Sequence, residues 1–317
     1  MTTSTSKPPR PLKGVRILSL CLNLPGPAAL MRCRQMGATC VKLEPPAPAG
    51  SAPGTSGDPM GLYNRSAYDQ LHNGVRLLRA DLKTETGQKL LHKELAKADV
   101  LLTSFRPSAL VKLGLPWKAL HKQYSTLSQV AIVGAPGARA EEPGHDLTYL
   151  AENGLVTGLD LPPTLYADMG GSLMACEAVL QAMLARQRSG KGSLIEVALS
   201  DAAAYLALPR TWSLTQPGAA VGGGHAGYKV YRCKDGRVAI AALEPHFAAA
   251  LCAQAGVAKP NIMTLFAPPT HQAIASWAAS LTCQQLDSLA KEKDIPLYPL
   301  PDPAPRVQTK EAGSKAR

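Results

Sequence analysis

Residues 15–44 read VRILSLCLNLPGPAALMRCRQMGATCVKLE, and this stretch decides the expected fold. Its two ends, 15–20 and 39–44, are short apolar runs with β-branched residues, a composition typical of buried strands. Between them, residues 27–36 are rich in Ala, Leu and Met and follow a Gly-Pro pair, which predicts a helix. A strand, a helix and a second strand within about 30 residues predict a β-α-β unit.

The same alternation continues along the chain. Further strand-like runs occupy 98–105, 127–134 and 193–200, and helix-like segments occupy 84–97 and 169–188. Strands that alternate with helices pair in parallel, and the helices cover the sheet. The sequence therefore predicts an α/β fold with a Rossmann-like parallel sheet covered by helices.

A different composition begins after Pro209. A Gly-rich stretch leads into YKVYRC, the turn Lys234-Asp235-Gly236 and RVAIAAL, which together predict a β-hairpin. Helix-like segments near 246–255 and 270–293 follow, so we expect a second, smaller α+β domain. The expected organisation is a disordered tail at 1–12, a large α/β domain at 13–215, a small domain at 216–295 and an extended Pro-rich, basic tail at 296–317.

The formal net charge of +11 indicates an anionic partner. The basic residues are scattered, only three Phe and three Trp are available for stacking, and no zinc finger or RNA-recognition motif is present. These features argue against nucleic acid. A small phosphorylated ligand fits the charge better.

The seven cysteines include no C-x-x-C pair and no Cys/His cluster with metal-ligand spacing. We therefore expect no metal site and a reducing, cytoplasmic environment. The N-terminus lacks the apolar core of a secretory signal, and no apolar run reaches the length of about 18 residues that a spanning helix needs. No membrane association is expected.

Three positions could carry chemistry. His145 lies at a loop tip, and Asp146 is expected to cap the following helix. Asp168 precedes Gly170 and Gly171 at the expected start of a long helix, where free N–H groups can hold an oxyanion. Glu244 follows the strand RVAIAAL. A loop histidine, an N-cap and a solvated strand end would each explain one of these residues without a function.

Taken in order, several segments resemble the class III CoA-transferase family of carnitine dehydratase and bile-acid-inducible proteins, and within it the α-methylacyl-CoA racemase branch. The resemblance rests on LKGVRILSLCLNLPGPAALMRCRQMGATCVKLEPP, on LLRADLKTETGQKLLHKELAKADVLLTSFRPSALVKLGL, on GHDLTYLAENG, on ADMGGSLMACEAVLQAMLARQRSGKGSLIEVALSDAA and on YKVYRCKDGRVAIAALEPHF. Together these blocks cover roughly residues 12–250, and their order is more specific than any single motif.

The resemblance implies an acyl-CoA enzyme whose large domain binds coenzyme A. CoA would enter as part of the substrate, with no separate cofactor, and the chain would form an intertwined homodimer. By position, His145 and Asp168 match the proton-transfer residues of the racemases, and Glu244 matches an acid beside them. Inverting a stereocentre next to a thioester needs one base to remove the α-proton and an acid on the opposite face to return one.

Two alternatives stay open beside a racemase or epimerase acting on a 2-methylacyl-CoA. A CoA-transferase would use Asp168 as the nucleophile that takes the acyl group from CoA and passes CoA to a carboxylate. A catalytically degraded acyl-CoA binding protein is the third. Departures from the family motivate it: the loop GAPGARAEEP lacks the family's Trp and Gln, the connection from Asn153 to Asp168 is shorter, and the family's Arg in the first βα loop is replaced by Asn23 or Leu24.

The CoA phosphates would contact cationic side chains and helix-start N–H groups. By position the candidates are Lys42, Lys83, Arg106, Lys112, Gly170 and Gly171. The four cations lie near the carboxyl ends of strands or in the loops after them, where ligands bind in open α/β sheets. Each could equally be a solvated surface charge.

Overall fold

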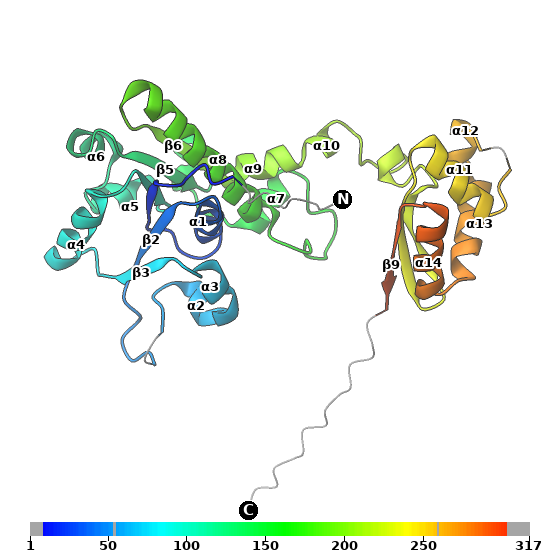
Figure 1. Cartoon of the computed structure of the whole chain (residues 1–317), viewed down its shortest axis with the longest axis horizontal. Helices are drawn as coiled ribbons and strands as arrows, with labels where there is room; N and C mark the ends of the chain where they lie inside the picture. Colours follow the sequence, from blue (N-terminus) through cyan, green and yellow to red (C-terminus); the bar gives the residue numbers. More distant parts are fainter. Residues whose placement is uncertain (1–8, 53–54, 259, 303–317) are drawn as a thin grey trace, which may run out of the picture. The chain divides into compact units, whose positions relative to one another are not determined.

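The computed structural model describes residues 9–52, 55–258 and 260–302. The chain forms two compact units that divide between Ala207 and Leu208 (Figure 1). The sequence predicted this division between residues 215 and 216. Most of its two expected tails, residues 1–8 and 303–317, lies outside the described residues.

The first unit is built on a six-stranded sheet in the order β3-β2-β1-β4-β5-β6, and every neighbouring pair is parallel. This confirms the predicted α/β fold. The strands are β1 (Arg16–Ser19), β2 (Thr39–Glu44), β3 (Arg76–Arg79), β4 (Val100–Thr103), β5 (Ser128–Val133) and β6 (Leu194–Ala198). The strand order reverses between the neighbours β1 and β4, which creates a topological switch point at the carboxyl edge of the sheet.

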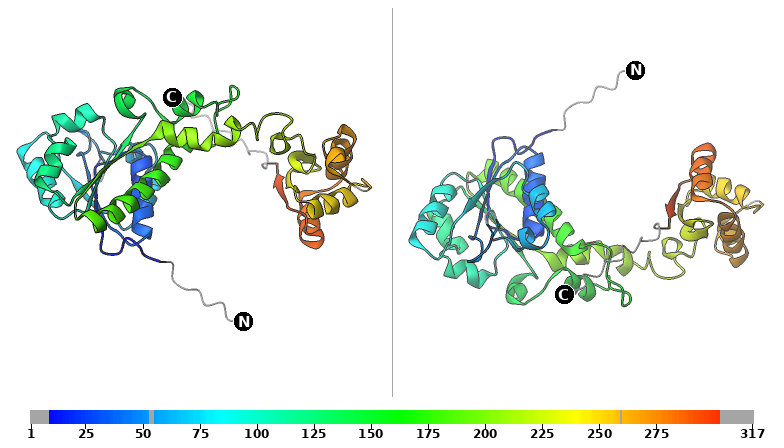
Figure 2. Two further views of the ribbon diagram at one scale, coloured as in Figure 1. Left: turned by 90° about the horizontal axis from the view of Figure 1, so that it is seen from above. Right: turned by 90° about the horizontal axis from the view of Figure 1, so that it is seen from below.

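Successive strand residues point to opposite helix layers. Ile17 and Val100 pack with α1, α7 and α8, whereas Leu18 and Leu101 pack with α4, α5 and α6. Figure 2 shows the blue and green helices on one side of the sheet and the cyan to teal helices on the other. The helices of this unit are α1 (Pro25–Gln35), α2 (Pro59–Tyr63), α3 (Arg65–Leu71), α4 (Glu85–Leu95), α5 (Pro107–Lys112), α6 (Trp117–Gln123), the 3-10 helix η1 (Gly137–Glu141), α7 (Asp146–Glu152), α8 (Tyr166–Ser189) and α9 (Leu199–Leu206).

Local signals explain where the long helices begin and end. Helix α1 begins at Pro25, whose missing N–H would have had no helical partner. The Thr84 hydroxyl accepts a hydrogen bond from the Gly87 N–H (3.1 Å) and caps α4. Helix α8 ends at Ser189, and the following Gly190, which has φ 68°, provides the left-handed residue of a helix C-terminus.

Strand β3 was not expected from the sequence. Its four residues, RLLR, carry a charge at each end and are mostly exposed at the edge of the sheet. A short, charged edge strand is a common way to prevent edge-to-edge pairing, and it has no apolar alternation to detect. Strand β3 forms because its backbone pairs with β2.

The expected tail at 1–12 ends earlier than predicted. Leu12 is buried in the core beside α1, and its N–H donates to the Met36 carbonyl (3.0 Å). The apolar side chain of Leu12 therefore belongs to the first unit.

The second unit contains an antiparallel sheet in the order β7-β8-β9. Strands β7 (Tyr228–Cys233) and β8 (Gly236–Ala241) form the predicted hairpin. Strand β9 (Leu297–Pro301) falls in the segment assigned to an extended tail; it pairs with β8, and Leu297 packs on the core of this unit.

Helices cover this smaller sheet. The expected helical segment at 270–293 is two helices, because the Thr282 hydroxyl accepts from the Gln285 N–H (3.3 Å) and starts a new one. The helices of the second unit are α10 (Leu208–Thr211), the 3-10 helix η2 (Ala220–Gly222), α11 (Pro245–Gln254), α12 (Ile262–Leu265), α13 (Pro268–Ala279) and α14 (Cys283–Lys293). Within the described ranges of both units, no helix has the length and apolarity needed to cross a bilayer.

Candidate active site

The carboxyl edge of the parallel sheet carries most of the expected site. Strand β1 ends at Ser19 and β4 ends at Thr103, and the loops after these neighbouring strands contain Asn23 and Arg106. Open α/β sheets bind ligands outside the carboxyl ends of the strands, at the switch point. The starts of α7 and α8 contribute two of the predicted reacting groups, His145 and Asp168.

A buried carboxylate joins the starts of α7 and α8. Asp146 is the first residue of α7 and is only 5% exposed. Its Oδ1 accepts a hydrogen bond from the backbone N–H of Asp168 (3.0 Å), which is the third residue of α8. Residues 22 positions apart in the sequence are thereby held together.

This bond corrects the expected role of Asp146. The sequence predicted that Asp146 caps its own helix, but the N-cap of α7 is His145. The Thr148 hydroxyl accepts from the His145 N–H (3.1 Å) and donates to the His145 carbonyl (2.7 Å), which closes the helix start. The Asp146 carboxylate is therefore available to α8, and the imidazole of His145 is exposed.

The carboxyl group of Asp168 is electrostatically perturbed. Burial, followed by the negative charge of Asp146, raises its pKa from 3.8 to about 6, while a charged His145 lowers it. Because His145 acts on this pKa, its side chain lies within electrostatic range of Asp168. A carboxyl group with a pKa near 6 can both accept and donate a proton close to neutral pH.

Two tyrosines near Asp168 were not singled out from the sequence. Burial raises the pKa of the Tyr149 phenol, and the charge of Asp168 raises it further. Burial also raises the pKa of Tyr63, with Asp58 and then Asp168 adding to the effect. Tyr149 lies one helical turn after His145, and this spacing was a usable signal. Nothing local marked Tyr63.

The hydroxyl groups of these tyrosines have different surroundings. The Tyr63 hydroxyl donates to Oδ1 of Asn23 (3.2 Å), at the loop after β1. The buried ring of Tyr149 packs against two glycines, since a Cβ atom on Gly134 or Gly144 would lie 2.2 Å or 2.5 Å from its hydroxyl. Gly144 therefore allows the chain before His145 to pass close to Tyr149.

Lys42 does not occupy the place expected of a phosphate ligand. Its side chain is fully buried, and its ammonium group donates to Asp58 and to Nε2 of His72 (2.9 Å). Glu44 lies 3.6 Å away. Because His72 Nδ1 lies 2.6 Å from the Tyr68 carbonyl, Nδ1 carries the proton and Nε2 accepts from Lys42. Lys42 therefore neutralises a buried acidic cluster, and its ammonium group is not exposed to a ligand phosphate.

The other three expected cations are exposed. Lys83 follows β3, Arg106 precedes α5 and Lys112 ends α5. Glu141 lies near the last two: its carboxylate accepts from the N–H (2.7 Å) and the hydroxyl (2.8 Å) of Ser108. Those bonds lower the pKa of Glu141, and Arg106 and Lys112 lower it further.

Gly170 and Gly171 have a packing role that differs from the expected anion contact. Helix α8 already begins at Tyr166, so both glycines lie inside it and not at its free N–H groups. A Cβ atom would lie 3.1 Å from Leu206 at Gly170 and 2.3 Å from Leu199 at Gly171. The glycines therefore let α9 approach α8.

Glu244 belongs to the second unit. It is the N-cap residue of α11, directly before Pro245, and its side chain is exposed. This position also follows β8, as the sequence indicated.

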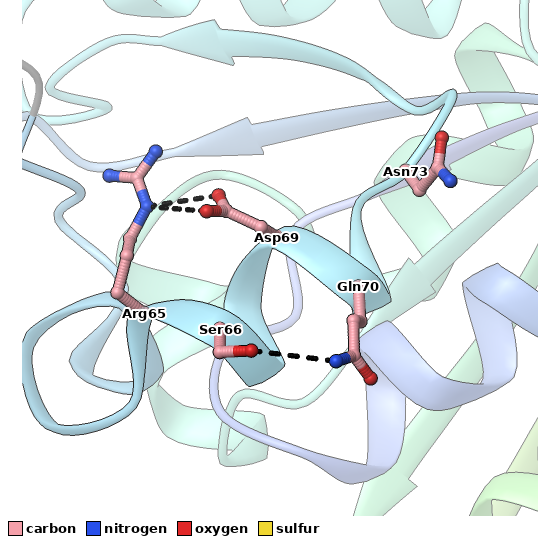
Figure 3. Close-up of a pocket in the computed structure, with 5 residues that line it drawn as sticks. All are labelled: Arg65, Ser66, Asp69, Gln70 and Asn73. Atoms are coloured by element: carbon pink, nitrogen blue, oxygen red, sulfur yellow. Dashed lines mark hydrogen bonds and ion pairs between the residues drawn. The ribbon is translucent and has the colours of Figure 1, made fainter.

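A shallow hollow of about 620 Å³ on α3 contains none of the expected site residues. Figure 3 shows its polar lining, in which Arg65 contacts Asp69 and Ser66 contacts Gln70. Its side chains are largely satisfied by one another, so this hollow is not a candidate active site.

The chain matches the family model of CoA-transferase family III over residues 12–315. Curated relatives include the succinyl-CoA--D-citramalate CoA-transferase of Chloroflexus aurantiacus, 28% identical over 92% of this chain and 79% of that protein. The alpha-methylacyl-CoA racemase of Mus musculus is 29% identical over 84% of this chain and 68% of that protein. Across the first curated relatives, the matched part spans from 50% to 79% of the relative's own length.

Solved structures agree on the fold. The crystal structure of a CAIB/BAIF family protein from Brucella suis superposes with a TM-score of 0.75 at 23% identity, over 93% of this chain and 85% of that one. The family match extends over nearly the whole sequence, and the sheet has the same architecture as this neighbour. The chain therefore belongs to CoA-transferase family III.

Proposed function

We propose that this chain racemises or epimerises a 2-methylacyl-CoA by two-base proton transfer between His145 and Asp168. The observation that carries the proposal is the carboxyl group of Asp168, whose pKa is raised to about 6 within electrostatic range of His145. A two-base reaction requires one group of the pair to be protonated while the other is free to accept a proton.

In each direction one group removes the α-proton of the thioester and the other protonates the opposite face. The enolate formed in between needs donors near its oxygen, and the first turn of α8 presents N–H groups close to Asp168. The family resemblance matches Glu244, in the second unit, to an acid of the racemases. The exposed Arg106, Lys112 and Lys83 would contact CoA phosphates.

CoA transfer is the second candidate, because curated relatives include CoA-transferases as well as racemases. In that reaction the Asp168 carboxylate would attack the thioester carbon and expel the CoA thiolate, leaving an acyl anhydride on the enzyme. The thiolate would then attack the aspartyl carbonyl, which forms an enzyme thioester and releases the donor carboxylate. An acceptor carboxylate would attack this thioester to form a second anhydride, and the expelled CoA thiolate would attack its acyl carbonyl to give the new acyl-CoA and restore Asp168. His145 has no required step in this scheme.

The test is isotope exchange in deuterated water. The protein is incubated with a 2-methylacyl-CoA, with and without a free carboxylate acceptor, while α-deuterium and the CoA thioester are both followed. We expect deuterium to enter without acceptor. CoA movement that requires the acceptor, without α-exchange, would instead establish the transferase, and tight CoA binding with neither reaction would establish a binding protein.

Matched variants assign the residues. His145→Ala and Asp168→Asn should each abolish exchange, whereas His92→Ala on α4 and Asp287→Asn on α14 make the same chemical changes elsewhere and should not. If transfer is the activity, Asp168→Asn should abolish it and His145→Ala should spare much of it.

The pH dependence separates the two mechanisms again. Proton exchange needs one proton shared by the pair, so kcat/KM should be bell-shaped. Transfer needs only the Asp168 carboxylate, so its rate should rise through about pH 6 and then stay level.

We further propose that the active form is an intertwined homodimer, as the family resemblance implies. Sedimentation equilibrium should give a mass of twice 33.4 kDa. A monomer at micromolar concentration would contradict this part of the proposal and leave the chemistry to be judged by the exchange assay.

A further inference from the structure

A cluster of two thiols and one carboxylate lies in the second unit and has no role in the chemistry above. Cys233 is the last residue of β7, Asp235 lies in the hairpin turn, and Cys283 is the first residue of α14. Among the described residues, these three form the only group of at least three Cys, His, Asp or Glu side chains placed to share a metal ion. We propose that they bind one thiophilic divalent cation such as Zn²⁺.

The distances between the ligand atoms fit this use. The sulfur atoms of Cys233 and Cys283 are 3.5 Å apart, and Oδ1 of Asp235 is 3.8 Å from the Cys233 sulfur. All three ligand atoms lie within 4.8 Å of one another. A Zn–S bond of about 2.3 Å gives a tetrahedron with edges of about 3.8 Å, so these side chains already lie near three corners of a tetrahedral site.

Hydrogen bonds from backbone N–H groups hold these three side chains in place. Oδ1 of Asp235 accepts the backbone N–H of Cys283 (2.7 Å), which fixes the carboxylate against the start of α14. The N–H of Lys234 donates to the Leu281 carbonyl (2.9 Å), which holds the turn to the segment before α14. A cation would therefore link two segments that are about 50 residues apart in the sequence and are already held together by these hydrogen bonds.

The cluster is also accessible from solvent and leaves one coordination position of the metal for water. Both cysteines are buried, whereas Asp235 is exposed. A cation can therefore enter beside the carboxylate, and water can complete the fourth position, as in zinc sites with three protein ligands.

Charge and protons balance in this step. Burial, then the neighbouring Cys233 and Asp235, raises the pKa of the Cys283 thiol to about 12. Hydrogen bonds, the first from the Cys283 backbone N–H, lower the pKa of Asp235 and keep it charged. Cysteine binds a metal as the thiolate, so a cation that binds both cysteines releases their two protons to water.

No metal site was expected from the sequence, because the cysteines lack metal-type spacing. Spacing detects ligands from one local segment, and this cluster combines a hairpin with a distant helix start. A second thiol pair, Cys33 and Cys176 in the first unit, is 3.9 Å apart but has no third ligand grouped with it among the described residues. That pair provides an internal comparison.

The test uses the full chain, reduced and freed of metal, titrated with Co²⁺ and then with Zn²⁺. We expect one Co²⁺ per chain, near-ultraviolet thiolate-to-metal absorption, tetrahedral visible bands, displacement by Zn²⁺ and a higher unfolding temperature with Zn²⁺. Cys233→Ser and Cys283→Ser should remove the thiolate bands, and Asp235→Asn should weaken binding at least about tenfold. Cys252→Ser in the same unit and Cys176→Ser in the thiol pair should retain Co²⁺ binding and the thiolate bands.

Asp235→Asn keeps an oxygen for the Cys283 N–H, so it tests the site without removing that structural contact. Absence of thiolate bands in the unchanged chain would overturn the proposal. So would binding that survives both cysteine substitutions, or a Cys233–Cys283 disulfide that persists after treatment with a reductant. None of these results bears on the isotope-exchange assay of the proposed enzyme.

Discussion

Replacing Asp168 by Asn should stabilise the protein at neutral pH while removing its activity. The charged form of Asp168 is disfavoured in the folded chain by burial and by the nearby charge of Asp146. Asparagine keeps the shape of the side chain and removes the charge. The substitution therefore removes the free-energy cost of placing a negative charge at this position.

The raised pKa of Asp168 sets the size of the expected gain in stability. A rise from 3.8 to about 6 corresponds to a cost of about 3 kcal/mol for the charged form of a carboxyl group. Asp168 is only partly buried, so solvent screening reduces the effect, and we expect a gain of about 1–3 kcal/mol.

The sign of the pH dependence follows from linkage. Between pH 3.8 and about 6 the folded state binds more protons at Asp168 than the unfolded state does, so this residue's contribution to stability falls as the pH rises through that window. Below it, Asp168 is protonated in both states and resembles Asn. The advantage of the variant should therefore be full above about pH 7 and vanish near pH 4.

Urea unfolding followed by circular dichroism at several pH values would measure the difference between the two proteins. Asp287→Asn is the matched control, because it removes an exposed aspartate that pairs with Lys291 on α14. A gain for Asp168→Asn that is equal at pH 4 and pH 8, or a loss of stability at pH 8, would refute the assigned cause of the raised pKa.

Three further substitutions test other parts of the structure. Lys42→Met should lower the free energy of unfolding by about 3–5 kcal/mol in urea, since it leaves buried carboxylates without their cation; a change below about 1 kcal/mol would contradict the buried cluster. Gly144→Ala should cost about 1–3 kcal/mol and most of the exchange activity, because the new methyl group meets Tyr149 beside His145; wild-type exchange rates would count against this geometry. Thr282→Ala should cost about 1 kcal/mol, seen as a lower thermal midpoint, through loss of the α14 cap, and an unchanged midpoint would show that the cap is not needed.

Some expected residues occupy the predicted elements but differ in role. Lys42 was expected to face a ligand because it lies in a strand near the carboxyl edge of the sheet, where phosphates bind. Asp58, Glu44 and His72 surround it instead, and the sequence around Lys42 alone did not indicate these partners. Gly170 and Gly171 were expected at a helix start, but α8 begins four residues before the first of them.

By itself, the sequence determined the parallel α/β sheet, the antiparallel hairpin and the family, because apolar periodicity and turn residues act over a few neighbours and are written locally. Only the tertiary structure decided that Asp146 binds the backbone of Asp168, that Lys42 is buried, and that Cys233 and Cys283 meet. The physical reason is that a polar side chain takes its pKa and its partners from whatever long-range packing brings within a few ångströms of it, and that packing belongs to the whole chain.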